Sequence, residues 1–261
     1  MLKKYTAPNS PELWDKVWRP TSVEQDQYNL RLTELDIVWE KISKEIEKHF
    51  GSFENLVVIE VGSGGGTTGL LFGRKGSKVT VLDYSTKALE RAQEFYKRHN
   101  IEVNTIYADA LNLPKNTLNQ YDVSLSFGLA EHFENEERIN IIKSHKEVLK
   151  SSGITFISVP NKWCPPYRIF KFVFEFIGKW KFGLEVPFLR KELIKISNNC
   201  GFKNPKVFGS SFYASFGFVN PMKLVKHLLK TKKDIRKLKR PKETFLDDSL
   251  GYAIILKAEK P

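Results

Sequence analysis

The residues of this chain best suited to chemistry form a glycine-rich loop directly after an apolar run. Glu60 ends a mostly β-branched stretch, residues 56–61, and is followed by Gly62, Gly64 and Gly66. A turn built from glycines carries no side chains, so a ligand can come close to its backbone N–H groups. The pattern predicts a buried strand that leads into a loop for a polar ligand.

Two common nucleotide-binding patterns fit this loop poorly. The dinucleotide pattern G-x-G-x-x-G fails when it starts at Gly62, because its last position is Thr67. Gly64, Gly66 and Gly69 do match it, but out of register with the end of the strand. The phosphate-binding pattern G-x-x-x-x-G-K-[ST] is absent from the loop. A nicotinamide dehydrogenase is therefore a distant alternative, and the interpretation of the chain as an ATPase lacks its main sequence motif.

Two further carboxylates occupy comparable places along the chain. Asp83 follows the strand-like stretch 79–82, 21 residues beyond Gly62, and Asp109 follows the strand-like stretch 103–107. The carboxyl ends of parallel strands meet at one edge of a sheet, where such sheets bind ligands. Both aspartates are therefore candidate ligand-binding groups. The alternative is that Asp83 caps a helix and Asp109 forms a turn.

An alternation of strands and helices must position these groups. Such a pattern predicts a mostly parallel sheet covered by helices on both faces. The regular rhythm breaks after Pro160. The predicted strands are 56–61, 79–82, 103–107, 121–127, 154–159, 206–212 and 252–258. The predicted helices are 34–49, 67–75, 85–100 with Ser85 as a possible cap, 136–149 and 190–200.

Four segments in order resemble one enzyme family, the class I (Rossmann-like) S-adenosylmethionine-dependent methyltransferases. They are E-x-G-x-G-x-G at residues 60–66, V-L-D-Y-S at 81–85, Y-A-D-A-L-N-L-P at 107–114, and Y-D-V-S-L-S-F at 121–127 with G-L-A-E-H-F after it. In motif style the chain is most similar to small-molecule and quinone O-methyltransferases. The resemblance implies an α/β fold with a seven-stranded, mostly parallel sheet of order 3-2-1-4-5-7-6, its last strand antiparallel.

The resemblance also implies how the cofactor, S-adenosyl-L-methionine, is bound. Asp83 would accept both ribose hydroxyls, as a carboxylate with two oxygens can. Asp109 would accept the adenine amino group, with Tyr84 and Leu111 beside the ring. Glu60 would contact the ammonium directly or through water. The full set of expected cofactor residues is Glu60, Gly62, Ser63, Gly64, Asp83, Tyr84, Ser85, Asp109, Ala110, Leu111, Phe127 and Gly128.

Glu131 and His132 resemble the Glu-His pair of the quinone enzymes. His132 is the candidate catalytic base, because its ordinary pKa near 6.5 suits proton removal at neutral pH; the alternative is that it only packs at a helix start. Glu131 is assigned to the acceptor. The upstream position that can hold a metal ligand in those enzymes is Gly128 here, and no CxxC or His-Cys cluster exists. The sequence therefore predicts no metal.

A second motif suggests another substrate class. Cys164, Pro165, Pro166 and Tyr167 are similar to the (D/N/S)-P-P-(Y/F) of enzymes that methylate amino groups of nucleic acids. Here the motif follows the fifth predicted strand instead of the fourth, and a thiol replaces the polar group. Nucleic acid is therefore the weaker alternative for the acceptor.

Aromatic residues supply the expected acceptor pocket. Residues 163–188 contain nine aromatics, and we interpret residues 161–189 as a lid insertion with Tyr167, Phe170 and Trp180 lining an apolar pocket. Near the N-terminus, Trp18 and Tyr28 belong to a stretch that resembles segments which fold over the cofactor in this family. The alternative for both regions is ordinary core packing.

The charge of the chain is concentrated in one segment. The 261 residues include 42 Lys and Arg against 30 Asp and Glu, a net charge of +12, and ten of the cations fall between residues 222 and 242. Apolar residues at helical spacing lie between those cations, so a basic amphipathic insertion is predicted at 220–245. It would dock to anionic lipid or an acidic partner, bind nucleic acid, or be a solvated helix face.

Taken together, these patterns predict one methyltransferase domain over residues 1–261, with an N-terminal helical cap at 1–50. It would methylate a small or lipid-like molecule, with a hydroxyl group as the expected acceptor. The alternatives are an RNA or protein methyltransferase and a non-catalytic protein that binds S-adenosylmethionine or docks to membranes. No apolar run reaches the roughly 18 residues of a membrane span, and no secretory signal is evident. The expected location is the cytoplasm, with peripheral contact to an anionic membrane left open.

Overall fold

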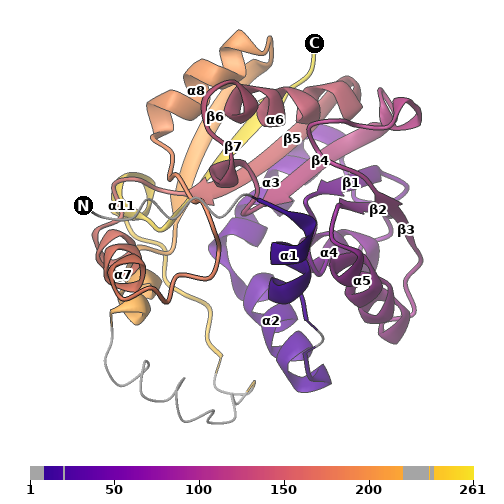
Figure 1. The fold of residues 1–261 in the computed structure, drawn as a ribbon. Helices are drawn as coiled ribbons and strands as arrows, with labels where there is room; N and C mark the ends of the chain where they lie inside the picture. Colours follow the sequence, from indigo (N-terminus) through magenta and orange to yellow (C-terminus); the bar gives the residue numbers. More distant parts are fainter. Residues whose placement is uncertain (1–8, 20, 220–234, 236–237) are drawn as a thin grey trace.

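A seven-stranded sheet forms the centre of the computed structural model, which describes residues 9–19, 21–219, 235 and 238–261 (Figure 1). The strand order is β3-β2-β1-β4-β5-β7-β6. Only β7 runs antiparallel to its neighbours β5 and β6. This confirms the predicted fold class and strand order. The strands are β1 Val57–Val61, β2 Lys78–Asp83, β3 Val103–Tyr107, β4 Tyr121–Phe127, β5 Leu149–Pro160, β6 Lys203–Ser210 and β7 Ala253–Glu259.

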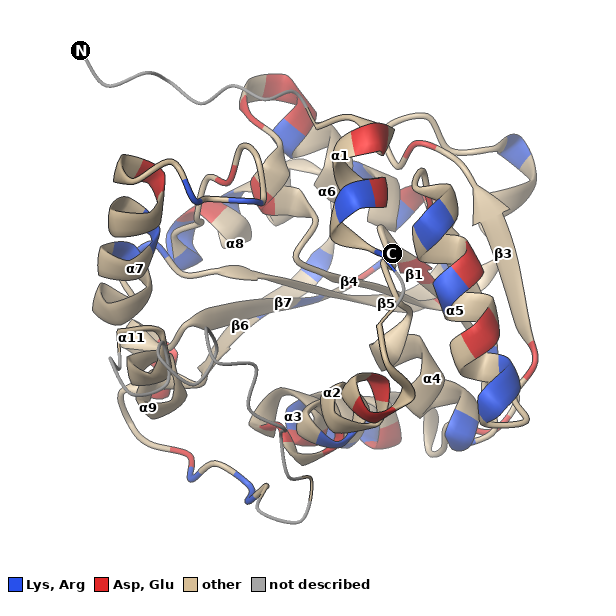
Figure 2. Cartoon of the chain, turned by 60° about the horizontal axis from the view of Figure 1, so that its bottom comes forward, with Lys and Arg blue, Asp and Glu red and all other residues tan. Residues whose placement is uncertain are grey.

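Helices cover both faces of the sheet, and the alternation of side chains along each strand gives each face its own core (Figure 2). On β1, Val58 packs with α3, α4 and α5, whereas Ile59 packs with α6 and α8 on the opposite face. The helices are α1 Pro11–Val17, α2 Val23–Leu35, α3 Ile37–Phe50, α4 Thr67–Arg74, α5 Thr86–Arg98, α6 Asn135–Val148, α7 Pro165–Phe176, α8 Arg190–Asn199, α9 Phe212–Ser215 and α11 Asp247–Leu250. The 3-10 turns are η1 Lys115–Thr117, η2 Ala130–His132 and η3 Phe216–Phe218.

The expected elements of the sheet are present with shifts at their ends. The prediction that Ser85 caps a helix is confirmed, because its hydroxyl accepts the N–H of Ala88 at 3.1 Å. The helix expected at 34–49 begins only at Ile37. Asp36 has extended backbone angles and its carboxylate accepts the Val38 N–H at 2.8 Å, so it ends α2 and caps α3.

The N-terminal helices are tied to the body of the molecule by buried polar contacts. The carboxylate of Asp26 on α2 accepts hydrogen bonds from Arg91 and Arg98 of α5, at 2.7 and 2.6 Å. Burial raises the pKa of Asp26, but the hydrogen bonds from Thr21 and Arg91 outweigh it and hold that pKa below its usual value. On α1, Asp15 accepts the hydroxyl of Ser85 at 2.6 Å. These contacts bring the N-terminal segment to the carboxyl end of β2.

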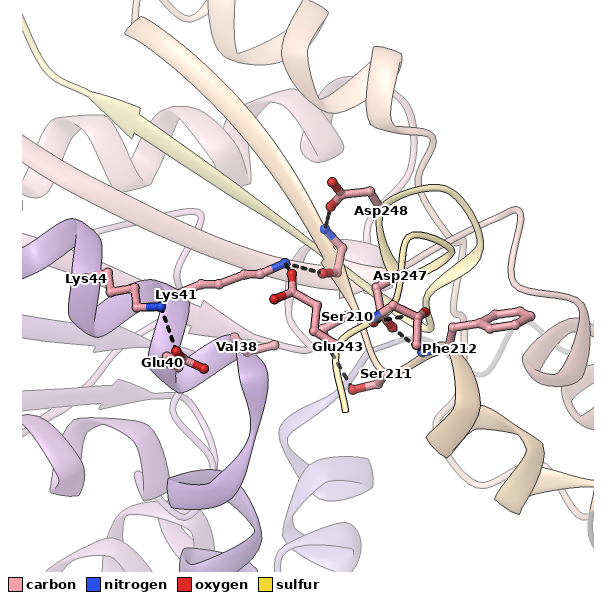
Figure 3. Close-up of polar contacts among 12 residues, drawn as sticks. Val38, Glu40, Lys41, Lys44, Ser210, Ser211, Phe212, Glu243, Asp247 and Asp248 are labelled. Atoms are coloured by element: carbon pink, nitrogen blue, oxygen red, sulfur yellow. Dashed lines mark hydrogen bonds and ion pairs between the residues drawn. The ribbon is translucent and has the colours of Figure 1, made fainter. Parts of the chain in front are cut away.

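The chain leaves the sheet after β6 and returns to it before β7 through a narrow region that we call the neck, residues 209–212 and 244–251 (Figure 3). The carboxylate of Asp247, which is 2% exposed, accepts the N–H groups of Phe212 and Thr244, each at 2.7 Å. A Cβ atom on Gly209 would lie 2.0 Å from the Asp247 carbonyl oxygen, and one on Gly251 would lie 2.3 Å from it. The neck therefore closes only because both positions are glycine.

Most of the predicted basic insertion, residues 220–245, lies outside the described residues. At its C-terminal end Arg240 forms an ion pair with Glu40 of α3, and Glu243 forms one with Lys41 at 2.6 Å. Lys41 also donates to the carbonyl oxygen of Gly209 at 3.2 Å, so this end of the segment is attached to both α3 and the neck (Figure 3).

Replacing Asp247 by alanine should lower the free energy of unfolding by about 2–4 kcal/mol, because the buried N–H of Phe212 and the half-buried N–H of Thr244 lose a carboxylate acceptor. Urea unfolding followed by circular dichroism measures this. Asp248→Ala is the matched control: its carboxylate accepts the Gly209 N–H, but the side chain is 62% exposed, so water can replace it. Equal losses in the two variants would contradict the role given to Asp247.

Candidate functional site

A cavity of about 420 Å³ lies at the carboxyl ends of β1, β2 and β4, under the N-terminal segment. Parallel sheets bind ligands at this edge. Eight of the expected cofactor residues line this cofactor cavity: Gly62, Asp83, Tyr84, Asp109, Ala110, Leu111, Phe127 and Gly128. The sequence did not single out Asn9, Leu82, Ala108, Leu129, Phe133, Glu137 and Leu184, which line it too, and Trp14, Trp18 and His132 complete the wall.

The glycine loop has the left-handed backbone that its composition suggests. Gly62, Gly64 and Gly66 have φ angles of 61°, 52° and 65°, which other residues rarely adopt. A Cβ atom on Gly64 would lie 2.1 Å from the Trp18 ring. The loop therefore presents bare backbone to its neighbours, and the indole of Trp18 rests directly on it.

Asp83 is the most strongly organised polar group of the cofactor cavity. One carboxylate oxygen accepts the Gly64 N–H at 2.8 Å and the other accepts the Ser85 N–H at 2.9 Å. Burial raises the pKa of Asp83, and these N–H donors oppose that rise. Each oxygen can accept a second hydrogen bond, so the geometry fits a ligand with two neighbouring hydroxyl groups.

A second carboxylate, Asp109, lies beside an apolar part of the same cavity. Its oxygens accept the Leu111 N–H at 2.9 Å and the Asn112 side-chain amide at 3.2 Å. Leu111, with Leu129 and Phe133, supplies apolar lining next to it. A planar base with one donor group fits this end, as a nucleoside does.

Glu60 faces away from the cofactor cavity. It is 3% exposed, and one of its oxygens accepts the Gly69 N–H of α4 at 2.8 Å. Burial, with a smaller contribution from the charge of Asp83, raises the pKa of Glu60 to about 8. The side chain is therefore protonated at neutral pH. Its expected contact with a cofactor ammonium stays a prediction.

A second cavity of about 330 Å³, the hydroxyl-lined cavity, adjoins the first, and Trp18 and Phe127 line both. Asp36 and Glu60 contribute carboxyl groups to it. The buried hydroxyl of Ser63 has no hydrogen-bond partner among the described residues. The other hydroxyl-bearing residues that line this cavity are Thr33, Thr67, Thr68, Ser158, Ser210, Ser211 and Tyr252.

Among the remaining expected cofactor residues, Ser63 belongs to the hydroxyl-lined cavity, Gly64 lies beneath Trp18, and Ser85 is buried at the start of α5. The backbone N–H of Ser85 is held by Asp83. The structure thus brings the expected residues together around the glycine loop, and their roles toward a bound cofactor stay predictions.

His132 lines the cofactor cavity, and its neighbours define its chemistry. Its Nδ1–H donates to the carbonyl oxygen of Leu184 at 2.6 Å, which places the lone pair of the neutral ring on Nε2, and the ring also has a hydrogen bond with the backbone of Gly128. Burial lowers the pKa of His132 to about 4, so the ring is neutral at pH 7. The edge of the Trp14 ring packs against it, with ring centroids 4.7 Å apart. The ring can accept a proton, but only as a weak base.

Glu131 lies behind His132 in a buried acidic cluster, outside the lining of the cofactor cavity. One of its oxygens is buried with no partner among the described residues. Burial, and then the charge of Glu185, raise the pKa of Glu131 well above its usual range. Glu185 accepts the Tyr167 hydroxyl. No sequence motif marked Glu185, because it lies in an irregular segment far along the chain.

The expected acceptor aromatics do not line the cofactor cavity. Phe170 packs on Phe174 and Phe218, with ring centroids 4.3 and 5.3 Å apart, and Trp180 is 6.3 Å from Phe170. Tyr167 is buried against Tyr252. Tyr28 on α2 lines neither this cavity nor the hydroxyl-lined one. Of the expected acceptor residues, only Trp18 reaches the two cavities, so the other contacts with an acceptor stay predictions.

In the described part of the chain, no group of three or more His, Cys, Asp or Glu residues is placed to hold a metal ion. The same residues include no helix long and apolar enough to cross a bilayer. For an organic cofactor the fit is better: a bare-backbone loop, a carboxylate with two open lone pairs and an apolar slot surround one cavity.

Comparison with known proteins identifies the same region. Residues 58–153 match the family model described as a methyltransferase domain. The ubiquinone biosynthesis O-methyltransferase of Rickettsia canadensis is 28% identical over 143 residues, which cover 54% of this chain and 58% of that protein. The protein of the same name from Pelagibacter ubique is 27% identical over 201 residues, 75% of this chain and 82% of that one.

A solved structure extends the likeness to the fold. The magnesium protoporphyrin IX methyltransferase of Synechocystis PCC 6803, crystallised with bound SAH, superposes with a TM-score of 0.61. The superposition covers 96% of this chain and 93% of that one, at 15% identity. The seven-stranded sheet is therefore that of the methyltransferase fold.

Replacing Asp83 by alanine should weaken S-adenosylhomocysteine binding at least about tenfold, because the diol loses both acceptors. Calorimetric titration measures this, with Asp83→Asn as the variant that keeps one oxygen for the Gly64 N–H. Glu136→Gln, an exposed carboxylate of α6, is the control and should bind as the wild type does. An unchanged affinity in folded Asp83→Ala would remove Asp83 from the site.

Replacing Glu60 by glutamine should change how stability depends on pH. Between about pH 4.5 and pH 8 the folded wild type holds a proton on Glu60 that the unfolded chain releases. The unfolding free energy of the wild type should therefore fall, relative to Glu60→Gln, by about 1.4 kcal/mol per pH unit as the pH rises through this window. Urea unfolding at several pH values measures the difference, and parallel pH profiles would show that Glu60 ionises normally.

Proposed function

We propose that the protein transfers a methyl group from S-adenosylmethionine to a hydroxyl of a small molecule. The premise is the class I S-adenosylmethionine-dependent methyltransferase domain that this chain carries. The observation that carries the proposal is the Asp83 carboxylate, buried at the carboxyl end of β2 with both oxygens oriented by loop N–H groups. It presents two acceptors to the cofactor cavity, as a ribose diol requires.

In this proposal the cofactor cavity holds S-adenosylmethionine, which supplies a methyl group activated by its positive sulfur. Asp83 binds the ribose, and Asp109, Ala110 and Leu111 receive the adenine. The bare loop at Gly62 and Gly64 lets the methionine part lie against the backbone. Alignment and exclusion of water then account for most of the rate, since methyl transfer is an in-line displacement.

The adjoining hydroxyl-lined cavity is the proposed acceptor site. Its volume of about 330 Å³ suits a small molecule, and Trp18 and Phe127 form the wall that it shares with the cofactor cavity. Asp36 and the hydroxyls of Ser63, Ser158 and Ser210 offer hydrogen bonds to a polar acceptor. A polynucleotide is a poorer fit, because a cavity of this size would have to take a base flipped out of its strand.

His132 lines the cofactor cavity and not the hydroxyl-lined one, so it is the proposed proton acceptor for a hydroxyl that extends past the shared wall of Trp18 and Phe127. His132 would take the proton of the acceptor hydroxyl on Nε2 while its Nδ1–H stays on the carbonyl of Leu184. The bound cofactor would supply the methyl group, and its sulfur would leave as the neutral thioether of S-adenosylhomocysteine. A pKa of about 4 keeps Nε2 of His132 unprotonated through the neutral range. The O-methyltransferase names of the Rickettsia and Pelagibacter relatives support a hydroxyl acceptor.

Two other functions remain as alternatives. An RNA or protein methyltransferase would use the cationic segment for its acceptor, and RNA binding that weakens steeply with salt would favour it. A protein that binds S-adenosylmethionine without catalysis would show tight binding and no transfer. A cytoplasmic location, with peripheral membrane contact through residues 220–245, belongs to the same proposal.

The proposed activity is tested with S-adenosylmethionine carrying a labelled methyl group, incubated with low-mass, lipid, RNA and protein fractions of a cell extract. Label should appear in the low-mass or lipid fraction. Thr33→Phe, which narrows the hydroxyl-lined cavity from the surface of α2, should reduce this transfer at least about tenfold and leave S-adenosylhomocysteine affinity unchanged. Label confined to RNA or protein would refute the small-molecule acceptor.

Replacing His132 by alanine should slow transfer at least about a hundredfold while S-adenosylhomocysteine affinity changes little, since a general base typically contributes that much. His132→Gln is the companion variant, because it keeps polar volume without a basic nitrogen. Single-turnover rates with the labelled cofactor measure the effect. Wild-type rates in either variant would show that the acceptor needs no base here.

A further inference from the structure

Helix α7 packs one largely aromatic face inward and exposes a second apolar face. Five large apolar side chains of its outward face are exposed. They are Ile169 (57%), Phe172 (61%), Val173 (43%), Phe176 (70%) and, just past the end of the helix, Ile177 (49%). They recur at the three- and four-residue spacing of one helix face. On the opposite, inward face Lys171 is 6% exposed, beside the aromatic side chains of Tyr167 and Phe170. A surface helix normally presents polar side chains to the solvent instead.

The inward contacts hold α7 in this orientation. Lys171 forms an ion pair with Glu175 and lies over the Trp180 ring, 4.4 Å from its centroid. Phe170 and Tyr167 pack against Phe218 of η3. Turning the helix to bury its apolar face would break each of these contacts. The exposed face is therefore a product of the fold.

The position of α7 makes this face accessible to a large partner. In Figures 1 and 2 the helix stands at the edge of the molecule, away from the sheet. Exposed apolar side chains gathered on one helix face are uncommon on proteins without a binding partner for them. We call Ile169, Phe172, Val173, Phe176 and Ile177 the α7 face.

Cations border the α7 face. Residues 162–183 contain five Lys and Arg and a single acidic residue, Glu175. Lys162, Arg168, Lys179 and Lys181 form no ion pair with any carboxylate of the described residues. Further along the chain, residues 222–242 add ten more cations. An apolar helix face with unpaired cations beside it is the combination that interfacial helices use.

We propose that the α7 face docks this protein onto the surface of an anionic lipid bilayer. Its aromatic and aliphatic side chains enter the boundary between headgroups and acyl chains, while Lys162, Arg168, Lys179 and Lys181 contact lipid phosphates. Charge argues against two other occupants. A second copy would bring the same cations together across a symmetric interface, and residues 222–242 of this chain carry the same sign.

The proposal is tested by co-sedimentation of the full chain with vesicles of phosphatidylglycerol and phosphatidylcholine in equal amounts, and with phosphatidylcholine alone. The wild type should bind the first and not the second. The double variant Phe172→Ser, Phe176→Ser should bind at least about tenfold more weakly. Val23→Ser, Ile139→Ser removes two exposed apolar side chains from α2 and α6 and should bind as the wild type does.

Insertion itself is measured with an environment-sensitive dye. Phe176→Cys in a Cys200→Ser background carries the dye on the α7 face, and the remaining Cys164 is buried. Its emission should shift to the blue with anionic vesicles, whereas dye on Val23→Cys should not respond. The double variant Lys179→Glu, Lys181→Glu should bind anionic vesicles more weakly, and its binding should depend less on salt concentration. Thermal unfolding and S-adenosylhomocysteine affinity should be unchanged in all these variants.

Three results would overturn the proposal. The first is that the wild type binds neither kind of vesicle. The second is that the α7 variants bind anionic vesicles as the wild type does, which would assign docking to residues 222–242 alone. The third is that the protein binds no vesicle and sedimentation velocity shows a dimer that the double variant Phe172→Ser, Phe176→Ser dissociates. None of these results depends on methyl transfer, so the proposal stands or falls separately from the activity.

Discussion

One buried carboxylate, Asp83, joins the parts of the molecule that form the cofactor cavity. It accepts the N–H of Gly64 in the glycine loop and the N–H of Ser85 at the start of α5. Ser85 in turn donates to Asp15 of α1, which brings the N-terminal cover onto the same edge of the sheet. Loop, helix and cover are therefore arranged before any ligand arrives, and hydrogen bonds to backbone oppose the free-energy cost of burying the charge.

Burial changes the ionisation of the carboxyl groups at this edge of the sheet. The carboxyl groups of Glu60, Glu131 and Glu185 are withdrawn from water, which raises the pKa of each. Glu60, whose pKa is raised to about 8, is protonated at neutral pH and can donate a hydrogen bond as well as accept one. This part of the site is therefore less anionic than its number of carboxyl groups suggests, while the net charge of the chain is +12.

The sequence predicted what local patterns determine and missed what distant packing determines. The strand order followed from the resemblance at residues 60–133, the Ser85 cap from the capping pattern, and the left-handed backbone of the glycine loop from its composition. The break at Asp36 was missed because one side-chain hydrogen bond ended a continuous apolar pattern. Leu184 and Glu185 meet η2 only through tertiary contacts that carry no motif. The aromatic insertion was expected to line a pocket, but Tyr167 and Phe170 on the inner side of α7 pack against Phe218, and a second apolar face of the helix is exposed.

The neck has a consequence for how chains of this architecture can diversify. Asp247 and the two close-packed glycines fasten both ends of the excursion at one point, so the register of β6 on β7 is set locally. The entropy of closing such a loop rises only slowly with its length. Changes of length between Phe218, whose ring packs on Tyr167 and Tyr252, and Arg240, which pairs with Glu40, are thus compatible with an unaltered sheet, and other sequences can be grafted there by evolution or by protein engineers.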